Sequence, residues 1–371
     1  MHPETKTRLI QLILFLLTLV CTTAAGAEWI YGRSILEDAD KWVSLQKLES
    51  GFLFSLPFLG ILTIHEFGHY ITAKRNKIDV TLPYYIPLFG IPFSIGTLGA
   101  FIRIKTRNIT NKQYFDIGLA GPLAGFIAAV ILLIYGFTHL PPIEYIFSIH
   151  PEYAEYGNDF AKHVYNDIGS NFYLGDNLLF QFFEHFVADP TRIPPKYEMM
   201  HYPFLMAGYL ALFFTSLNLL PIGQLDGGHI LYGLVGHRWH SFISKSIFLI
   251  FIFFAGLGIA HPYLEFTSAI IRFGIYLFFL FAILRTSFAS TSNRWMIAVS
   301  ISSTQFLLVY LFPHLDGYNN WLLFAFIIGR FLGVEHPKSE EEPIGLGRKI
   351  LGWLSLVIFV LCFSPQPFVT N

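Results

Sequence analysis

The stretch that decides the fold is residues 51–73, which read GFLFSLPFLGILTIHEFGHYITA. A helix rises about 1.5 Å per residue, so a stretch of this length crosses the roughly 30 Å hydrocarbon core of a bilayer. It contains His65, Glu66 and His69. Counted from Gly51, His65 lies roughly 21 Å and His69 roughly 27 Å into that core, where ionisable groups cost several kcal/mol unless paired or metal-bound. These three residues therefore predict a functional site within a membrane span.

The composition of the whole chain agrees with a membrane protein. Of its 371 residues, 54% are hydrophobic and 13% are charged, whereas soluble domains carry about 25% charged residues. The net charge of −1 gives no sign of nucleic-acid binding, so we expect a lipid bilayer and no nucleic acid as partner. The two cysteines, Cys21 and Cys362, stand in apolar runs and are expected to pack rather than to form a disulfide or a metal cluster.

Apolar stretches that could span a bilayer occur along the whole chain. They lie at about 9–27, 51–73, 115–138, 203–222, 245–260, 268–284, 295–312, 319–334 and 350–366. Several are nearer 16 than 20 residues in length. The expected fold is an all-α polytopic membrane protein with about eight or nine transmembrane helices.

The first stretch has two interpretations. Lys6 and Arg8 precede the apolar run, and Ala25-Gly26-Ala27 would serve as a cleavage site, which is typical of a signal peptide. The same stretch, 9–27, is long enough to be a retained transmembrane helix. Both interpretations stay open.

The basic residues predict the orientation of the spans. If the spans alternate from a cytoplasmic N-terminus, sixteen of the 24 Lys and Arg residues lie on the cytoplasmic side. Those on the opposite side are Arg33, Lys41, Lys47, Lys162, Arg192 and Lys196. Because basic loops stay inside, we expect a multi-pass protein with its site toward the cytoplasm. The membrane is expected to be a bacterial inner membrane.

Three parts follow from this arrangement. Residues 1–50 would hold a first helix and a short external segment, 51–236 the functional core, and 237–371 the C-terminal helices. The core includes one long external loop at about 139–202, in which Leu178–Phe186 is predicted to be an amphipathic helix at the membrane surface.

The histidines of the first-quoted stretch have the spacing of metal ligands. On a helix, His65 and His69 project from one face about one turn apart, so both imidazoles can bind one metal ion. Glu66, next to the first histidine, can reach a metal-bound water as general base. The alternative is a pair of histidines that make hydrogen bonds to neighbouring helices.

A second constellation lies at 218–228, NLLPIGQLDGG. Pro221 blocks helix continuation, and Gly223 and the Gly227-Gly228 pair allow turns, so the backbone is expected to unwind here. Asp226 would lie at the same membrane face as the histidines and could be the third metal ligand, leaving the fourth position to water. The alternative is an aspartate in a solvated turn.

Together, the segments His65–His69 and Asn218–Gly227 resemble the site-2 protease family of intramembrane zinc metalloproteases, in its branch without a PDZ domain. Phe93–Ile104 resembles the family's membrane-associated β-hairpin, and Ile117–Gly125 its helix of small residues. His336-Pro337 before the last span is similar to the bacterial and chloroplast branch.

The resemblance implies Zn²⁺ as cofactor and, as substrate, a single-pass transmembrane protein cut within its membrane segment. It implies that Asn218 donates a hydrogen bond to the scissile carbonyl and that the hairpin, with Gly96, Thr97 and Gly99, binds substrate. The alternative for Asn218 is a polar contact between helices. A catalytically inactive membrane scaffold and a metal transporter are the alternatives. Neither would need Glu66 as a base.

Other features favour supporting roles. The spacing Gly121-x-x-x-Gly125 predicts close helix packing. His229 could approach the metal but is expected to lie around it or on the surface, and His237 and His240 are expected to be solvated loop residues.

Overall fold

The computed structural model describes residues 3–34, 45–165 and 172–370, which divide into two compact units. The first unit comprises Met1–Arg107, Ala120–Asn218 and Val357–Asn371, and the second comprises Asn108–Leu119 and Leu219–Leu356. The helices α5 (Asn111–Thr138) and α13 (Leu346–Cys362) each belong partly to both units. The three-part division made from the sequence stays a prediction.

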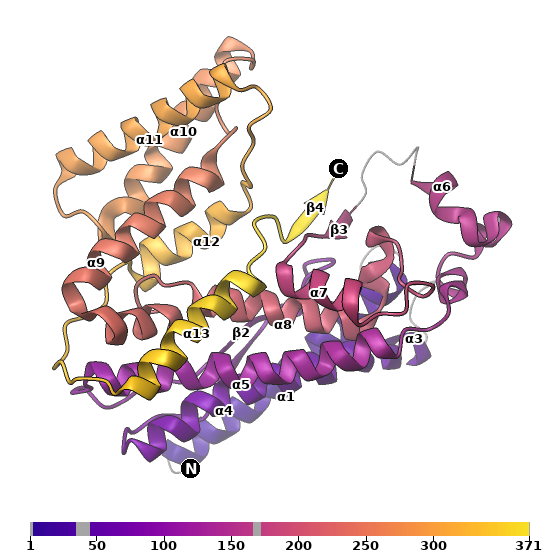
Figure 1. The fold of residues 1–371 in the computed structure, drawn as a ribbon, viewed down its shortest axis with the longest axis horizontal. Coiled ribbons are helices and arrows are strands. Elements are labelled where there is room, and N and C mark those ends of the chain that lie inside the picture. Colours follow the sequence, from indigo (N-terminus) through magenta and orange to yellow (C-terminus); the bar gives the residue numbers. More distant parts are fainter. Residues whose placement is uncertain (1–2, 35–44, 166–171, 371) are drawn as a thin grey trace. The chain divides into compact units, whose positions relative to one another are not determined.

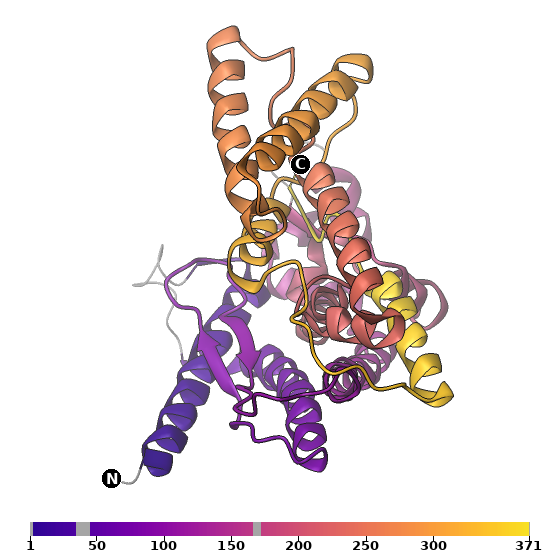
Figure 2. The ribbon, with the colours of Figure 1, turned by 90° about the vertical axis from the view of Figure 1, so that its left-hand side faces the viewer.

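The first unit contains most of the helices and strands of the N-terminal half. They are α1 (Pro3–Tyr31), α3 (Leu45–Ser50), α4 (Phe52–Arg75), β1 (Tyr84–Pro87), β2 (Thr97–Phe101), most of α5, η1 (Ile143–Ser148), η2 (Pro151–Asp159), α6 (Phe160–Val164), β3 (Phe172–Leu174), α7 (Leu178–Phe186), η3 (Lys196–His201), α8 (Pro203–Leu219), the end of α13, and β4 (Phe368–Thr370). Helix α1 packs against α4 and against the β1–β2 hairpin, which lies beside it in Figure 2.

The second unit is helical in the part of the chain that the structure describes. Its elements are the first turns of α5, α9 (Asp226–Gly256), α10 (Phe266–Ile283), η4 (Leu284–Thr286), α11 (Thr291–Leu311), α12 (Trp321–Ile327), the π-helical η5 (Ile328–Leu332) and the start of α13 (Figure 1). Helix α9 packs against α11 and α12, and α10 packs against α11.

Helix α4 has one face buried in the protein and one face turned outward. The buried residues recur every three or four positions: Phe54, Ser55, Phe58, Leu59, Ile61, Leu62, His65, Glu66, His69 and Ala73. The outward residues are nevertheless large and apolar: Phe52, Leu53, Leu56, Ile64, Phe67 and Ile71. Water disfavours such an exterior, whereas lipid accommodates it, so α4 carries its polar groups inward and its apolar groups outward.

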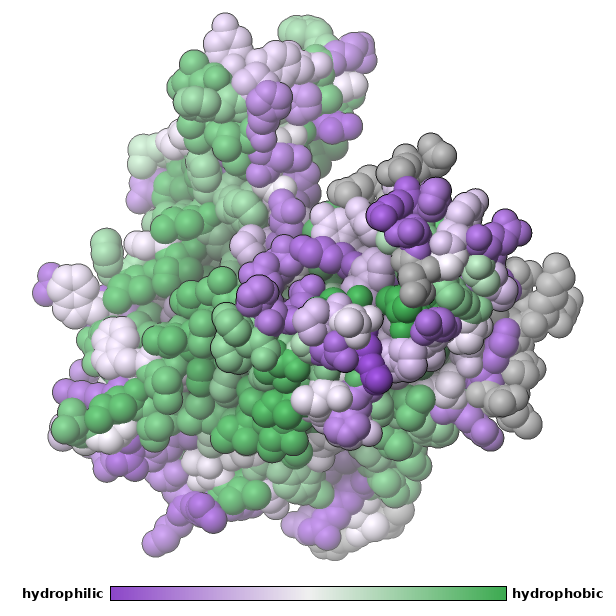
Figure 3. Space-filling model, turned by 45° about the vertical axis from the view of Figure 1, so that its right-hand side comes forward, coloured by the Kyte–Doolittle hydropathy of each residue, from purple (hydrophilic) through white to green (hydrophobic). Residues whose placement is uncertain are grey.

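Six described helices are long and apolar enough to cross a membrane. They are Glu4–Tyr31, Lys47–Arg75, Asn111–Thr138, Asp226–Gly256, Phe266–Thr286 and Thr291–Leu311. The apolar helices Pro203–Leu219 and Trp321–Leu332 are shorter, as is α13 with 17 residues. Hydrophobic side chains cover wide areas of the face shown in Figure 3. The chain is a helical, multi-pass membrane protein, as predicted, but three of the expected spans are short helices.

The β-hairpin has a different first strand from the one expected. Residues 93–104 supply only one named strand, β2, which pairs antiparallel with β1, so that Tyr85 is opposite Ala100. Proline-rich sequence around β1 concealed this strand from a pattern-based prediction, since proline is a strand breaker. Gly96 has a φ of +77°, and a Cβ on it would lie 2.5 Å from the Cα of Thr22. The glycine therefore lets the hairpin approach α1 closely.

The loop between α5 and α8 contains the predicted amphipathic helix. α7 spans Leu178–Phe186, as expected, and the Asn177 side chain caps it by accepting a hydrogen bond from the backbone N–H of Phe180. Phe180 is buried and Phe186 is exposed, which gives the helix two distinct faces. Strand β3 in the same loop pairs with β4 near the C-terminus (Figure 1). The location of α7 at a membrane surface stays a prediction.

The segment between α8 and α9 unwinds as expected, but over fewer residues. Residues 220–225 are non-helical, with a φ of +57° at Gly223. Gly227 and Gly228 do not form turns, because they belong to the first turn of α9. A Cβ on Gly227 would lie 2.0 Å from the carbonyl oxygen of Leu219. These two glycines are therefore required for close packing of α9 on the unwound segment.

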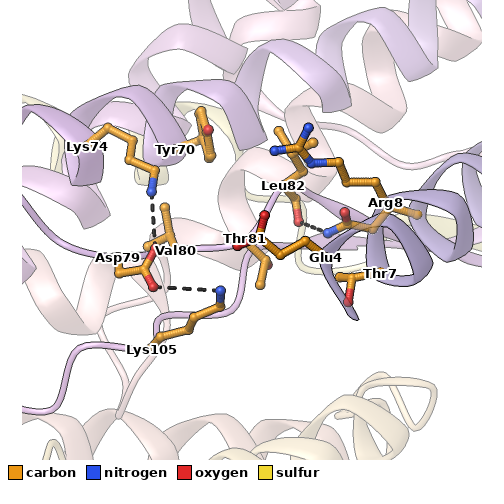
Figure 4. Close-up of a pocket in the computed structure, with 11 residues that line it drawn as sticks. Glu4, Thr7, Arg8, Tyr70, Lys74, Asp79, Val80, Thr81, Leu82 and Lys105 are labelled. Atoms are coloured by element: carbon orange, nitrogen blue, oxygen red, sulfur yellow. Dashed lines mark hydrogen bonds and ion pairs between the residues drawn. The ribbon is translucent and has the colours of Figure 1, made fainter. Parts of the chain in front are cut away.

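A polar pocket lies where α1, the end of α4 and residues 79–82 meet (Figure 4). Asp79 is 3.2 Å from the Lys74 ammonium and 3.6 Å from the Lys105 ammonium. The hydrogen bond from Lys74 lowers the pKa of Asp79 below its ordinary value. The Gln11 side chain donates to the carbonyl oxygen of Leu82 at 2.7 Å, which fixes this segment on α1.

Candidate metal centre

His65 and His69 face each other on the buried side of α4. Their Nε2 atoms are 3.0 Å apart, their rings meet edge to face at 76°, and each residue is only 6% exposed. Two nitrogens bound to one tetrahedral zinc at about 2.05 Å would be separated by about 3.4 Å. Both imidazoles already direct a nitrogen toward a common point, so the pair fits a shared zinc ion.

Glu66 is the third member of this cluster, beside the two histidines. It is 4% exposed, and its Oε1 atom is 4.0 Å from the Nε2 atom of His65. The three side chains each place one possible ligand atom within 4.8 Å of the other two. A buried carboxylate next to two imidazole nitrogens can accept a proton from a water molecule bound between these side chains.

Asn218 reaches the same cluster from α8. Its Nδ2 atom lies 3.4 Å from the Nε2 atom of His65. An amide N–H so placed can donate a hydrogen bond to an oxygen that binds beside the histidines. The first unit thus brings together four of the predicted site residues: His65, Glu66, His69 and Asn218.

The glycines of α5 lie directly against the two histidines. A Cβ on Gly121 would be 2.1 Å from the Nε2 atom of His69, and a Cβ on Gly125 would be 3.2 Å from the Cβ of His65. A Cβ on Gly68 would be 2.6 Å from the carbonyl oxygen of Ala120. The predicted close helix packing at Gly121 and Gly125 is confirmed, and it holds both imidazoles in place.

Substitution of Gly121 by alanine is therefore expected to weaken zinc binding. The added methyl group cannot fit unless His69 moves, and misplacing a metal-binding imidazole costs about 10–100-fold in metal affinity. Gly60→Ala is the matched control, because a Cβ on this α4 glycine meets nothing within 4 Å. Zinc titration of both purified variants checks this expectation, and equal affinities would contradict it.

Asp226 belongs to the second unit, where it is the first residue of α9. An acidic residue in the first turn of a helix is favourable in itself by about 0.3–1 kcal/mol, since the helix dipole is positive there. Its role as third metal ligand stays a prediction, as do the substrate contacts of Gly96, Thr97 and Gly99.

One turn after Asp226, His229 contacts His336, a pairing that the sequence did not reveal. His336 Nδ1 donates to the carbonyl oxygen of Pro337 at 2.6 Å, so its Nε2 accepts from His229 Nδ1 at 2.8 Å. Burial lowers the pKa of His336 to about 4, which keeps it a neutral acceptor. Tyr114 stacks on the His229 ring at 5.1 Å. His229 is thus held by two neighbours, His336 and Tyr114, and its supporting role stays a prediction.

The prediction for His240 was wrong. This residue is not in a solvated loop but in α9, where it is fully buried. Gly236, with a φ of +77°, is non-helical and divides α9 into two helical segments at a kink, and the second segment begins with residues that were assigned to a loop.

Comparisons with known proteins point to one family. The model of peptidase family M50 matches residues 53–260, which is more than half of the chain. The rice protein named probable zinc metalloprotease EGY1, chloroplastic (Oryza sativa subsp. japonica), is 30% identical over 203 residues, which are 53% of this chain and 30% of that protein. The protein of the same name from Arabidopsis thaliana is 27% identical over 245 residues, 61% of this chain and 40% of that protein.

These matches cover less than half the length of either relative. No solved structure matches the chain. The family match spans α4, with its histidine pair, as well as Asn218 and Asp226. The chain therefore belongs to peptidase family M50, the site-2 protease family of zinc metalloproteases.

Proposed function

We propose that this protein hydrolyses peptide bonds within the transmembrane segments of other membrane proteins. The observation that carries this proposal is the buried cluster of His65, Glu66 and His69 on a helix whose outer face is apolar. A soluble substrate would not reach a site of this kind, whereas a substrate that diffuses in the bilayer could approach it from the side. The relatives named as probable zinc metalloproteases support the chemistry.

Each site residue has a distinct task in this mechanism. A zinc ion held by His65, His69 and Asp226 would supply a Lewis acid that polarises the scissile carbonyl and acidifies water. The Glu66 carboxylate takes a proton from the attacking water and returns it to the nitrogen of the leaving amine. The Asn218 amide donates a hydrogen bond to the carbonyl oxygen as negative charge develops on it.

A helical substrate must unwind before it can be cut, because its amides are hydrogen-bonded within the helix. Strand β2 has β1 as its only partner in the described sheets, so its other edge can accept a further strand. The Thr97 hydroxyl donates to the carbonyl oxygen of Ile86 at 2.8 Å and supports the geometry around Gly99, whose φ is +104°. We infer that an unwound single-pass substrate pairs with this edge, beside Gly96, Thr97 and Gly99.

Ala100→Pro in β2 tests this role, because proline removes a backbone N–H from the strand. Cleavage is expected to fall by about tenfold, the equivalent of one lost hydrogen bond of about 1.4 kcal/mol, while zinc stays bound. Zinc content and melting temperature are measured alongside the cleavage rate. A variant with unimpaired cleavage would show that the hairpin does not present substrate.

We further propose that the site lies toward the membrane face with most basic residues. The basic residues Lys74 and Arg75 end α4, about 8 Å of helix rise beyond His69. Positive residues at the ends of spans favour the side on which the protein is synthesised. The relatives are chloroplast proteins, so the comparisons do not support the bacterial inner membrane that the sequence suggested.

The overall function is tested with purified protein and single-pass reporter substrates in detergent. Cleavage is expected to stop when a chelator removes zinc and to return when zinc is added back. Cleavage that persists in metal-free protein would contradict a zinc mechanism.

A further inference from the structure

A second cluster of metal-binding side chains lies in the loop between α5 and α8, far along the sequence from His65. It consists of His150, Glu198 and His201. The Nε2 atoms of the two histidines are 3.4 Å apart, and the Oε2 atom of Glu198 lies 3.4 Å from His201 Nε2 and 3.8 Å from His150 Nε2. All three residues belong to the first unit.

These three distances match the ligand shell of a metal ion. A triangle with sides of 3.4, 3.4 and 3.8 Å has a point about 2.1 Å from each corner. Zinc binds imidazole nitrogen at about 2.0–2.1 Å and carboxylate oxygen at about 2.0–2.2 Å. Tetrahedral zinc needs about 3.4 Å between each pair of donor atoms, so only the distance from Glu198 Oε2 to His150 Nε2 would have to shorten, by a few tenths of an ångström.

The surrounding groups orient each side chain for metal binding. His201 Nδ1 lies 2.9 Å from the carbonyl oxygens of both Trp29 and Ile30, so it carries the hydrogen and leaves the Nε2 lone pair facing the cluster. His150 Nδ1 lies 3.3 Å from the carboxylate of Glu152. Metal-binding histidines commonly donate their other N–H in this way to a carbonyl or a carboxylate.

Glu198 is oriented from its other oxygen. The Tyr165 hydroxyl donates a hydrogen bond to Glu198 Oε1, which directs Oε2 toward the two imidazoles. Among the described residues, none makes a hydrogen bond with this Oε2 atom, although Glu198 is only 2% exposed. A buried oxygen without such a partner is costly, and a bound cation would remove that cost.

Solvent can reach the cluster from one side. The His201 side chain is 1% exposed and that of Glu198 3%, but the His150 side chain is 25% exposed. An ion can therefore enter past His150, and water can occupy a fourth position there. Through Trp29 and Ile30, the bound ion would also tie this loop to the end of α1.

We propose that His150, Glu198 and His201 form a second metal site, for a divalent first-row transition-metal ion with zinc as the best match. Two imidazoles and one carboxylate are a donor set that zinc uses, whereas calcium and magnesium prefer oxygen ligands. The site is separate from the centre on α4 and needs no substrate for its occupancy.

The zinc content of the full-length purified protein tests this proposal. Wild type is expected to hold two zinc ions, and the double variants His65→Ala/His69→Ala and His150→Ala/His201→Ala are expected to hold one each. His163→Ala is the matched control, an exposed histidine of the same loop, and should keep two. If the His65/His69 variant holds no zinc, the proposed second site does not exist.

The same protein separates this proposal from the proposed function. Suppose that the wild type holds one zinc ion, which the His150→Ala/His201→Ala variant loses and the His65→Ala/His69→Ala variant keeps. That result would support the site at His150, Glu198 and His201 and would contradict the zinc site on α4.

A second measurement distinguishes loss of zinc binding from loss of folding. Zinc added to metal-free His65→Ala/His69→Ala protein should raise its melting temperature, because a ligand that binds only the folded state stabilises it. Adding Glu198→Gln, which keeps the side-chain size, should abolish that rise, and magnesium should produce none. A rise that survives Glu198→Gln would contradict the assignment. The absence of any rise in melting temperature would also contradict the assignment. A protonated Glu198 would then pair with the two histidines without a metal ion.

Discussion

Glu66→Gln is expected to reduce peptide cleavage by a factor of about 100–10,000 while the protein keeps its zinc and its fold. Glutamine has the size of glutamate but cannot accept the proton that leaves the attacking water. Glu66 is buried beside His65, with its Oε1 atom 4.0 Å from the imidazole Nε2, so its replacement leaves the two histidines in place. Cleavage of a transmembrane reporter, measured together with zinc content, checks this expectation.

The same variant separates an enzyme from the two alternatives. A membrane scaffold or a metal transporter needs no general base at this position, so Glu66→Gln would keep its function in either. If the variant cleaves the reporter at the wild-type rate, Glu66 is not the base and the proposed mechanism is wrong.

Asp226→Ala is expected to weaken zinc binding at the α4 centre by more than about 100-fold and to abolish cleavage. Loss of a group that only orients a ligand costs about 10–100-fold, and loss of a ligand itself should cost more. Zinc titration should use a protein in which the His150, Glu198 and His201 cluster has been removed, so that one site is read at a time.

Two variants distinguish metal binding from helix stabilisation. Asp226→Asn keeps the shape of the side chain at the start of α9 and removes its charge. Asp79→Asn removes an exposed carboxylate that pairs with Lys74 and should leave zinc binding unchanged. The interaction of Asp226 with the helix dipole is worth about 0.3–1 kcal/mol of stability. If Asp226→Ala and Asp226→Asn lower the melting temperature by an amount of this size and leave zinc affinity unchanged, Asp226 is not a metal ligand.

The sequence predicted features that depend on nearby residues. The i, i+4 spacing of His65 and His69 places both imidazoles on one face of α4, and their facing nitrogens follow from helix geometry alone. The apolar pattern of Leu178–Phe186 likewise determined α7 to the residue.

Features that depend on distant residues were missed. Glu198 and His201 meet His150 only because the loop folds back on itself, and no periodicity in the sequence indicates that contact. The burial of His240 depends on a second helical segment of α9 that begins directly after the kink at Gly236, and a glycine alone does not show whether a helix resumes after it. The direct contact of Gly121 with the His69 imidazole likewise depends on the packing of α4 against α5, and the glycine spacing lies on α5 alone.

The bond that the purified protein cuts in a single-pass reporter tests the central claim most directly. Mass spectrometry of the two products, with wild type and Glu66→Gln in parallel, identifies that bond. Cleavage within the apolar segment, at bonds that wild type cuts and the variant does not, is the predicted result. Cleavage confined to the polar flanks of the reporter would contradict hydrolysis within the membrane segment.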